Sequence, residues 1–598
     1  MSFRDAVHFF IFHTTRYLSP MLVATEWVFV ITGALLIAWS PFGSDRSLRR
    51  IRGACRSLAN RKNLAMVICG LFPVIVRLAM LGFAPVPDPS IHDEFSHLLL
   101  ADTLAHGRLT NPTHPMWMHF ESIHIIQQPT YNSMYPPGQG GILALGQVLF
   151  HEPWAGVVIS VGLMFAAMCW MFQGWLPPVW ALVGTMLAVL KIGVVGMWMN
   201  SYLGGPLAGV GGALLLGGAV RFKRQGFRAL HGFLAGIGLV ILMNTRPFEG
   251  AVLTLAVLAY LSPVLMRTMH RDRELLLRRV ILPAGAVLFC GFVFLGYYSW
   301  RVTGSPVVMP YQVNRNTYGW PENLAFLAPK KVEIRHQVIR DMYAKEVGNR
   351  RAYASFVSAV DNLNTRVFDN WTFFLGPALT VPLLFLPRVI RDRRTRALTV
   401  FLAVIAVLNL FQLVLYPFHL GPVVPVIYAI VAQALRHMYV SLSRARHLRG
   451  VYLAVVLPLC VILVGAMKQE AVELGIPMSY WEYAQEPHRD ARAQKEQWLQ
   501  SQPGKHLVIV RYAKFHNPNQ EWVYNKADID GQKIVWAREM DAASDGRLLE
   551  YFGDRKAWLL QADQYPPRLV RYEEHSEVKN KEKENLVCNS CEGLAGRE

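Results

Sequence analysis

Residues 63–84 read NLAMVICGLFPVIVRLAMLGFA, an apolar run long enough to cross a bilayer, which takes roughly 20 residues. After a short connection the chain continues Ile91-His92-Asp93-Glu94-Phe95-Ser96-His97, so two adjacent acids lie at the mouth of this run. Burying a carboxylate beside hydrocarbon is costly, and ionisable residues at such places are functional candidates by default. Packing therefore explains Asp93 and Glu94 poorly, and both are candidate functional residues.

Similar apolar runs recur along the 598 residues, 53% of which are apolar. We expect a mainly α-helical fold, a polytopic membrane bundle of about twelve spans. Hydropathy predicts these spans at 21–40, 63–84, 154–173, 177–199, 203–220, 229–244, 250–266, 280–297, 371–387, 398–416, 421–436 and 451–467. The net charge of +19 does not indicate a nucleic-acid partner, because many basic residues fall in short stretches between the spans.

The connections between the spans differ in charge. Those rich in arginine and lysine all fall on one side if the spans alternate, namely 41–62, 221–228, 267–279, 388–396 and 436–449. The positive-inside rule assigns that side to the cytoplasm. We therefore expect a multi-pass protein of the plasma (inner) membrane of a bacterium, with the other connections and the C-terminal portion outside the cytoplasm.

The chain is expected to have four parts. They are an N-terminal segment with an extra span and a basic cytoplasmic loop (1–62), a transmembrane catalytic domain (63–467), a small extracytoplasmic α/β domain (468–573) and a charged tail (574–598). The transmembrane part carries two large outer loops, at 85–153 and 298–370. The tail is low in apolar residues, so it is expected to be disordered.

The first outer loop is predicted to hold two helices on the membrane surface. The first follows Asp93 and would carry Glu94, His97 and Ala101 on its polar face. At its start a carboxylate can cap free N–H groups; this structural alternative for Asp93 leaves the second acid unexplained. The second helix, over 140–150, is opened by Pro136-Pro137, since proline suits the first turn of a helix.

An acid pair just after a span, a long first outer loop and Tyr135-Pro136-Pro137-Gly138 opening a surface helix together resemble the C superfamily of glycosyltransferases, GT-C. The resemblance covers roughly residues 60–440 and is to the branches of protein O-mannosyltransferases and lipid A aminoarabinose transferases. It implies a polytopic enzyme that uses a polyprenyl-phosphate-linked sugar, with its catalytic acid in the first outer loop. Tyr135 departs from the aminoarabinose branch, which tends to have a lysine there, and the span at 21–40 precedes the usual start.

The resemblance implies transfer of a sugar to an extracytoplasmic acceptor, which is a lipid, a glycan or a protein. Attack of an acceptor hydroxyl on the anomeric carbon needs a base to take its proton. Asp93 is the candidate base. Glu94 is the candidate helper, which orients the acceptor or tunes Asp93 by like-charge proximity. A single displacement of this kind inverts the anomeric centre.

Cations on the outer face are candidates for stabilising the departing phosphate. Arg246 lies in an outer turn, where an ion pair with Glu249 is the alternative. Arg301 ends another span, and His419 lies in a short outer turn where a solvated histidine is the alternative. The residues expected to bind substrate are His97, Asp102, Arg108, Tyr135, Arg246, Glu249, Arg301 and His419.

Histidines cluster in the first outer loop, which makes a metal site an alternative. His114, His119 and His124 are spaced by five, which puts neighbours about 140° apart on a helix and off a common face. No metal ligands and no cofactor are assigned, and a divalent cation is the less favoured alternative. Nucleotide-binding signatures are absent, which favours a lipid-linked donor over a nucleotide sugar.

Two other classes of function stay open. A transporter or flippase for lipid-linked sugars would place its ionisable groups near the bilayer midplane, whereas Asp93 and Glu94 lie at the outer boundary. The other class is a polymer ligase or a non-catalytic scaffold that presents the C-terminal domain.

Overall fold

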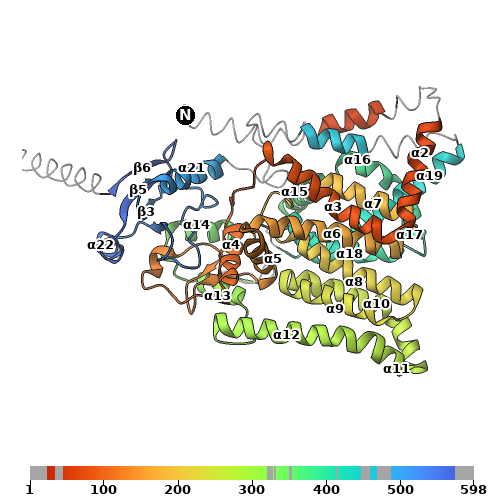
Figure 1. Ribbon diagram of the computed structural model, residues 1–598, viewed down its shortest axis with the longest axis horizontal. Helices are drawn as coiled ribbons and strands as arrows, with labels where there is room; N and C mark the ends of the chain where they lie inside the picture. The colour runs from red at the N-terminus through yellow and green to blue at the C-terminus, as the bar shows by residue number, and fades with distance from the viewer. Residues whose placement is uncertain are drawn as a thin grey trace, which may run out of the picture.

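The computed structural model describes residues 23–33, 35, 45–319, 327–328, 332–348, 350, 353, 355–412, 415–445, 458–467 and 487–572. These described residues are mostly helical, at 70%. Figure 1 shows a helical bundle at one end, a small sheet domain at the other and the first outer loop between them. In this described part six helices are long and apolar enough to cross a membrane, or seven if one bent pair is a single span. The chain is therefore a multi-pass membrane protein.

The bundle contains most of the helices. They are α2 (Asp45–Asn60), α3 (Lys62–Ala79), α6 (Pro153–Trp175), α7 (Pro178–Ile192), α8 (Gly205–Gln225), α9 (Ala229–Thr245), α10 (Pro247–Arg271), α11 (Arg273–Leu276), α12 (Leu282–Thr303), α15 (Phe356–Phe374), α16 (Gly376–Thr380), α17 (Leu386–Arg391), α18 (Arg396–Asn409) and α19 (Val424–Ala445). Proline at the first or second position starts α6, α7, α8, α10 and α12. There the missing N–H costs nothing and the fixed φ suits the helix.

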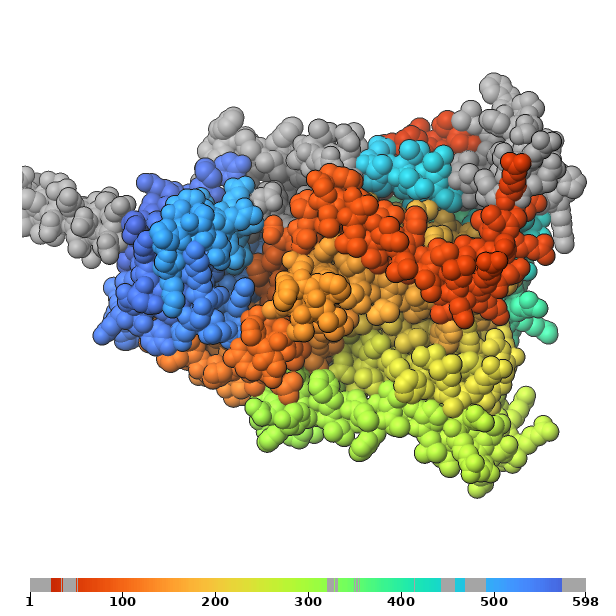
Figure 2. Space-filling view, viewed as in Figure 1, coloured from red at the N-terminus to blue at the C-terminus, as the bar shows by residue number. Residues whose placement is uncertain are grey.

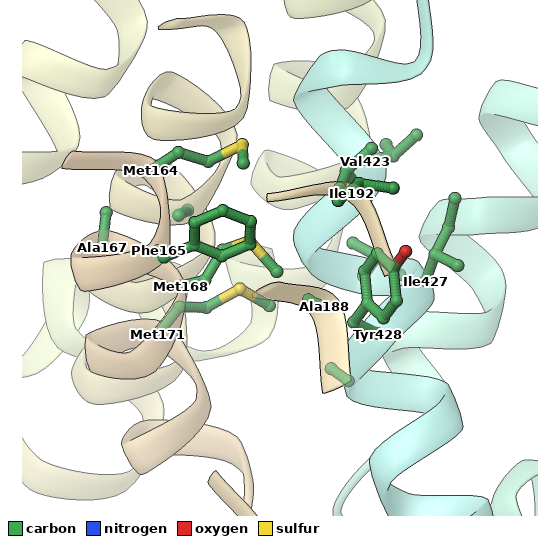
Figure 3. Packing of buried hydrophobic residues seen from close by; sticks show 14 of the residues in the cluster. Met164, Phe165, Ala167, Met168, Met171, Ala188, Ile192, Val423, Ile427 and Tyr428 are labelled. Atoms are coloured by element: carbon green, nitrogen blue, oxygen red, sulfur yellow. The ribbon is translucent and has the colours of Figure 1, made fainter. Parts of the chain in front are cut away.

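The core of the bundle lies where α6, α7 and α19 meet. Figure 3 shows Met164, Phe165 and Met168 of α6 opposite Ile192 of α7 and Tyr428 of α19. All of these side chains are fully or almost fully buried. Methionine has an unbranched side chain that fills irregular gaps, which suits the space between three helices.

Several predicted spans are not single straight helices. The span at 177–199 ends early, because α7 stops at Ile192 and the chain is not helical again before α8. The span at 371–387 belongs to the bent pair, in which α15 meets the helical run Gly376–Arg391 at 92°. The span at 398–416 gives only α18. Parts of the spans at 21–40 and 451–467, and all of the tail at 574–598, lie outside the described residues.

The non-helical stretch between α7 and α8 is held by Arg77, a buried residue of α3. Its guanidinium donates to Asn200 Oδ1 at 2.9 Å and to the carbonyl oxygens of Ala84 and Pro85 at 2.8 Å each. Arginine presents its donors in a rigid fork, so one side chain can fix several backbone groups. This stretch lies directly under the first outer loop, where it meets Glu94.

Two long loops, predicted to lie outside the cytoplasm and called here the first and second outer loops, cover one end of the bundle. The first contains α4 (His92–Ala105), η2 (Trp117–Phe120), β1 (Ile125–Ile126), β2 (Asn132–Ser133) and α5 (Pro137–Phe150), and the second contains α13 (Pro310–Tyr318) and α14 (Gln337–Gly348). The helix α5 begins at Pro137 as predicted. The helix α4 forms where predicted, but its polar face is not exposed, because ten of its 14 residues are buried, Glu94, His97 and Ala101 among them. The helix packs against α5 on one side and the C-terminal domain on the other.

The C-terminal domain is a small α/β unit. It contains α21 (Pro487–Ser501), β3 (His506–Arg511), β4 (Ile534–Arg538), α22 (Ala542–Tyr551), β5 (Lys556–Gln561) and β6 (Arg568–Arg571). The strand order is β4-β3-β5-β6, with β3 parallel to both neighbours and β6 antiparallel. Strands covered on both faces read as continuous apolar runs, as β3 does. Figure 2 shows this domain packed against the first outer loop.

Gly376 forms the bend between α15 and α16 with a left-handed φ of 62°. A Cβ there would lie 2.8 Å from Glu26 Oε2 and 2.9 Å from Lys191 Nζ. Gly376→Ala is therefore expected to lower the free energy of unfolding by about 1–3 kcal/mol, the cost of a strained backbone position. Thermal unfolding in detergent measures the effect. Gly285→Ala is the control, because a Cβ at that helical glycine meets nothing within 4 Å; equal midpoints for the two variants would contradict the prediction.

Candidate active site

Glu94, the second acid of the pair, caps the start of α4. Its Oε2 accepts hydrogen bonds from the backbone N–H groups of Ser90 at 2.8 Å and Ile91 at 3.2 Å. Its Oε1 accepts from the N–H of Tyr202, in the stretch between α7 and α8, at 2.9 Å. A glutamate at the third helical position that reaches back in this way is one half of a capping box. The cap that the sequence offered as the structural alternative for Asp93 is formed by Glu94 instead.

Asp93 faces the opposite way and keeps 22% of its side chain exposed. The hydroxyl of Tyr135 donates to its Oδ1 at 2.5 Å, and Nδ1 of His124 lies 3.5 Å from its Oδ2. The ring of His97, one turn further along α4, lies 4.5 Å from the ring of Tyr135. The structure thus brings three of the predicted site residues, Asp93, His97 and Tyr135, close together.

The surroundings of Asp93 keep its carboxylate ionised. Burial opposes ionisation, but the electrostatic attraction and hydrogen bond of His124, together with the hydrogen bond from Tyr135, outweigh burial and hold the pKa of Asp93 well below its usual range. Burial lowers the pKa of His97 to about 3, so its imidazole is neutral at physiological pH. Burial and the Asp93 charge raise the pKa of Tyr135, which therefore stays a hydroxyl donor.

His124 was missed by sequence reasoning as a partner of Asp93. In the sequence it stands out only as the last of the three evenly spaced histidines His114, His119 and His124. Its backbone has a left-handed φ of 62°, unusual for a residue with a side chain. Its carbonyl accepts a hydrogen bond from Ser96 Oγ at 2.7 Å, which fixes the strained turn against α4. Strained backbone that is held by its surroundings is common at functional sites.

Arg246 is positioned near the site by the packing of α5 against α9. Gly138 packs so closely on α9 that a Cβ would lie 2.5 Å from the carbonyl oxygen of Asn244. This contact places Arg246, at the start of α10, near Tyr135, where its charge opposes the rise in the pKa of Tyr135 and adds to the lowering of the pKa of His97. The guanidinium also lies 4.7 Å from the ring of Phe418. The structure records no ion pair between Arg246 and Glu249.

Arg315 is a second cation near the site, and nothing in the sequence singled it out. It lies on α13, where neighbouring Asn314 donates to the carbonyl of Ile125 at 3.3 Å and so joins this helix to the strand that follows His124. Arg315 is 3.4 Å from Glu346, and its charge also opposes the rise in the pKa of Tyr135. It comes from the second outer loop, so two loops contribute to the same site.

Other predicted residues have structural partners. Asp102 accepts from the N–H of Ala527 in the C-terminal domain and from Gln147, both at 2.9 Å. Glu249 is buried and accepts from Gln412 Nε2 at 3.3 Å. These contacts do not place Asp102 or Glu249 beside Asp93.

The remaining predicted residues are more peripheral. Arg108 follows the end of α4, where its N–H donates to the carbonyl of Thr103 at 3.1 Å. Arg301 is exposed near the end of α12. His419 accepts at Nδ1 from the N–H of Tyr416 at 3.2 Å, and its ring lies 4.6 Å from the ring of Phe418. His419 therefore shares Phe418 with Arg246.

The histidines weighed as metal ligands serve different contacts. His114 lies 3.0 Å from Asp530, and His119 lies 3.0 Å from the carbonyl of Arg538, both in the C-terminal domain. His124 turns to Asp93. Within the part of the chain that the structure describes, no group of three or more His, Cys, Asp or Glu is placed to hold a metal ion.

No protein-family model matches the chain, and no curated protein matches it. Solved structures are similar in fold. ArnT from Cupriavidus metallidurans bound to undecaprenyl phosphate is 13% identical, with a TM-score of 0.46 over 83% of this chain and 92% of that one. The Archaeoglobus fulgidus oligosaccharyltransferase with Zn and sulfate is 12% identical, with a TM-score of 0.45 over 77% and 61%. Both belong to the GT-C superfamily.

A third solved structure is the archaeal oligosaccharyltransferase AglB from Archaeoglobus fulgidus in complex with an inhibitory peptide and a dolichol-phosphate. It is 13% identical, with a TM-score of 0.41 over 83% of this chain and 68% of that chain. These structures belong to the superfamily that the acid pair and the first outer loop resemble.

The low pKa of His97 makes stability depend on pH. Its folded pKa of about 3 lies below the unfolded value of about 6.5, so the unfolded chain binds the extra proton between these values. Stability is therefore lost as pH falls below about 6.5, and His97 accounts for about 2 kcal/mol of that loss by pH 5. His97→Gln is expected to show a smaller drop in thermal midpoint between pH 7 and pH 5 than the wild type. Equal drops would contradict the buried, neutral state of His97.

Proposed function

We propose that the chain is a membrane glycosyltransferase that transfers a sugar from a polyprenyl-phosphate-linked donor to an extracytoplasmic acceptor. The observation that carries this proposal is the arrangement around Asp93. Its carboxylate is held ionised and keeps an opening to solvent, and Tyr135, which donates to it, lies within the electrostatic reach of two cations, Arg246 and Arg315. A base beside positive charge is the combination that attack on a sugar phosphate requires.

The arrangement supports a single displacement. The acceptor oxygen forms a bond to the anomeric carbon while the bond from that carbon to the phosphate oxygen breaks. Asp93 takes the hydroxyl proton, and Tyr135 orients the carboxylate through its hydrogen bond. Arg246 and Arg315 stabilise the departing polyprenyl phosphate, since arginine pairs with phosphate oxygens through several N–H donors. Attack from the face opposite the phosphate inverts the anomeric carbon.

Glu94 holds the helix that carries Asp93 against the bundle. Its carboxylate ties the first turn of α4 to Tyr202 of the bundle. Asp93 is the next residue back along the same turn, so its position depends on this contact. We therefore infer that Glu94 acts by holding Asp93 in place rather than by touching the acceptor.

The expected topology belongs to the same proposal. Besides the long helices, the described residues hold five shorter apolar helices, at Val23–Gly33, Pro178–Ile192, Ala229–Thr245, Arg396–Asn409 and Pro458–Met467. We infer that these complete a set of about twelve spans of a bacterial inner membrane. The basic connections then lie in the cytoplasm, while Asp93 and the domain at 468–573 lie outside it. Residues 63–467 form the catalytic membrane domain.

The test is a transfer assay with the purified chain in proteoliposomes. A polyprenyl-phosphate sugar is supplied with an acceptor fraction extracted from the envelope of the source cell, and release of polyprenyl phosphate is followed by mass spectrometry. Consumption of the donor with sugar appearing on the acceptor is expected. A matching nucleotide sugar is the control donor and is expected to stay intact. If no donor is consumed, the proposal that the chain is a glycosyltransferase with this donor is wrong.

A transporter of lipid-linked sugars is the second candidate, and one observation favours it. Glu26 and Lys191 lie together inside the bundle, beside the bend at Gly376. Ionisable groups next to broken helices are typical of transporter sites. The same proteoliposomes separate the two functions, because a transporter would move the donor across the membrane intact and release no polyprenyl phosphate.

A further inference from the structure

The C-terminal domain touches the first outer loop one residue away from Asp93. His92, the neighbour of Asp93, is buried, and its Nε2 lies 2.7 Å from the carbonyl oxygen of Pro518. Its Nδ1 forms a short hydrogen bond with the hydroxyl of Tyr524. The Tyr524 ring stacks on Phe95, with ring centroids 4.1 Å apart and planes 6° from parallel. One tyrosine of the C-terminal domain therefore contacts both ends of the first turn of α4.

These contacts define the tautomer of the neutral His92 ring. The Pro518 carbonyl can only accept, so Nε2 must carry the hydrogen and donate it. Nδ1 is then the acceptor in the neutral ring, and the hydroxyl of Tyr524 donates to it. Burial lowers the pKa of His92 to about 4, so the ring is neutral at physiological pH. The two hydrogen bonds fix the plane of the imidazole and the backbone that carries it.

The same segment of the C-terminal domain also holds the chain that carries His124. The hydroxyl of Ser122 donates to the carbonyl of Val523 in a short hydrogen bond. The hydroxyl of Tyr131 donates to the carbonyl of Asn525 at 2.8 Å. Segment 518–527 thus positions the two parts of the loop that contribute Asp93 and His124.

We propose that Tyr524 is a positioning residue of the active site, and that the C-terminal domain is part of the catalytic unit rather than an appended module. This rests on the proposed transferase function. Glu94 fixes the first turn of α4 from the bundle side, and Tyr524 fixes it through His92 from the other side. Small displacements of a catalytic group are costly, since a misplacement of about 1 Å can lower a rate about a hundredfold.

The test is a double-mutant cycle on the full-length chain in proteoliposomes. Tyr524→Phe keeps the ring that stacks on Phe95 and removes only the hydroxyl. It is expected to lower kcat about tenfold with little change in KM for the donor. His92→Gln is expected to have a similar effect, and the double variant is expected to lose no more than either single variant. Independent effects, which would multiply to about a hundredfold, or an unchanged kcat for Tyr524→Phe would overturn the proposal.

Tyr565→Phe is the matched control, because Tyr565 belongs to the same domain but is 94% exposed. Hydrogen exchange of the full-length protein gives a readout that does not need activity. Peptides covering residues 92–97 are expected to exchange faster in Tyr524→Phe than in Tyr565→Phe. If the wild type consumes no donor, the transferase proposal fails while this comparison still decides whether Tyr524 holds α4. Equal exchange in both variants would overturn the positioning role.

Discussion

Asp93→Asn is expected to lower kcat for sugar transfer about a thousandfold, within the range that a general base contributes. The amide has the shape of the carboxylate and can still accept the hydrogen bond from Tyr135. It carries no charge and cannot take a proton from an acceptor hydroxyl. The loss is therefore expected in kcat, with the protein folded and donor binding retained. The assay is release of polyprenyl phosphate in proteoliposomes.

Asp341→Asn is the control for this substitution. Asp341 lies on α14 in the second outer loop and accepts a hydrogen bond from Gln337 near the protein surface. It is expected to keep full activity, since it lies on another element with its own partner. Transfer at the wild-type rate by Asp93→Asn would show that Asp93 is not the base.

The second large effect is expected at the ion pair inside the C-terminal domain. Glu521 and Arg538 are 0% and 2% exposed and are joined by a short hydrogen bond. Arg538→Leu leaves the Glu521 charge buried without its partner, which costs about 3–5 kcal/mol. Arg538 also donates to the carbonyl of Glu121 at 2.7 Å, so docking of the domain on the first outer loop is expected to weaken as well. Thermal unfolding and limited proteolysis of the full-length chain measure both losses.

Two further variants separate charge burial from loss of packing. Arg568→Leu removes an exposed arginine of β6 and is expected to leave the unfolding midpoint unchanged. The double variant Arg538→Leu with Glu521→Leu removes both charges, and it is expected to be more stable than Arg538→Leu alone, because no unpaired charge remains. A single variant as stable as the wild type would contradict this account of the pair.

The long apolar runs were predictable, because a membrane span needs only local composition. The helices α6 and α8 follow directly from such runs. The bend at Gly376 was not predictable, because Glu26 and Lys191, which lie close to it in the structure, are far away in the sequence. The span at 371–387 therefore reads as continuous in hydropathy and is broken in the structure.

The candidate site also has a part that the local sequence predicts and a part that depends on distant residues. The acid pair was recognisable from its place after a span, but the roles of its members depend on partners remote in sequence. Glu94 is a cap because the N–H of Tyr202 reaches it, and that contact has no local signature. Arg315 lies in a loop with no periodic pattern, and only the packing of α13 on β1 brings it near Tyr135.

The burial of α4 was also unpredictable from its own residues. Its polar positions suited a helix facing water at the membrane surface. They are used instead to bind the C-terminal domain, as Asp102 does with the N–H of Ala527. A buried polar residue with a distant partner looks, in sequence alone, the same as an exposed one.

The docking of the C-terminal domain has a consequence for how the protein is made. The pairs that join the domain to the first outer loop are far apart along the chain, and Ser122 and Val523 are separated by 401 residues. A ribosome completes the loop long before it adds the segment that fixes His92. The loop therefore lacks its contacts with the C-terminal domain until the end of the chain has been synthesised and folded. A nascent or truncated chain would contain the acid pair and its neighbours, yet it would lack the contacts that fix the positions of His92 and His124.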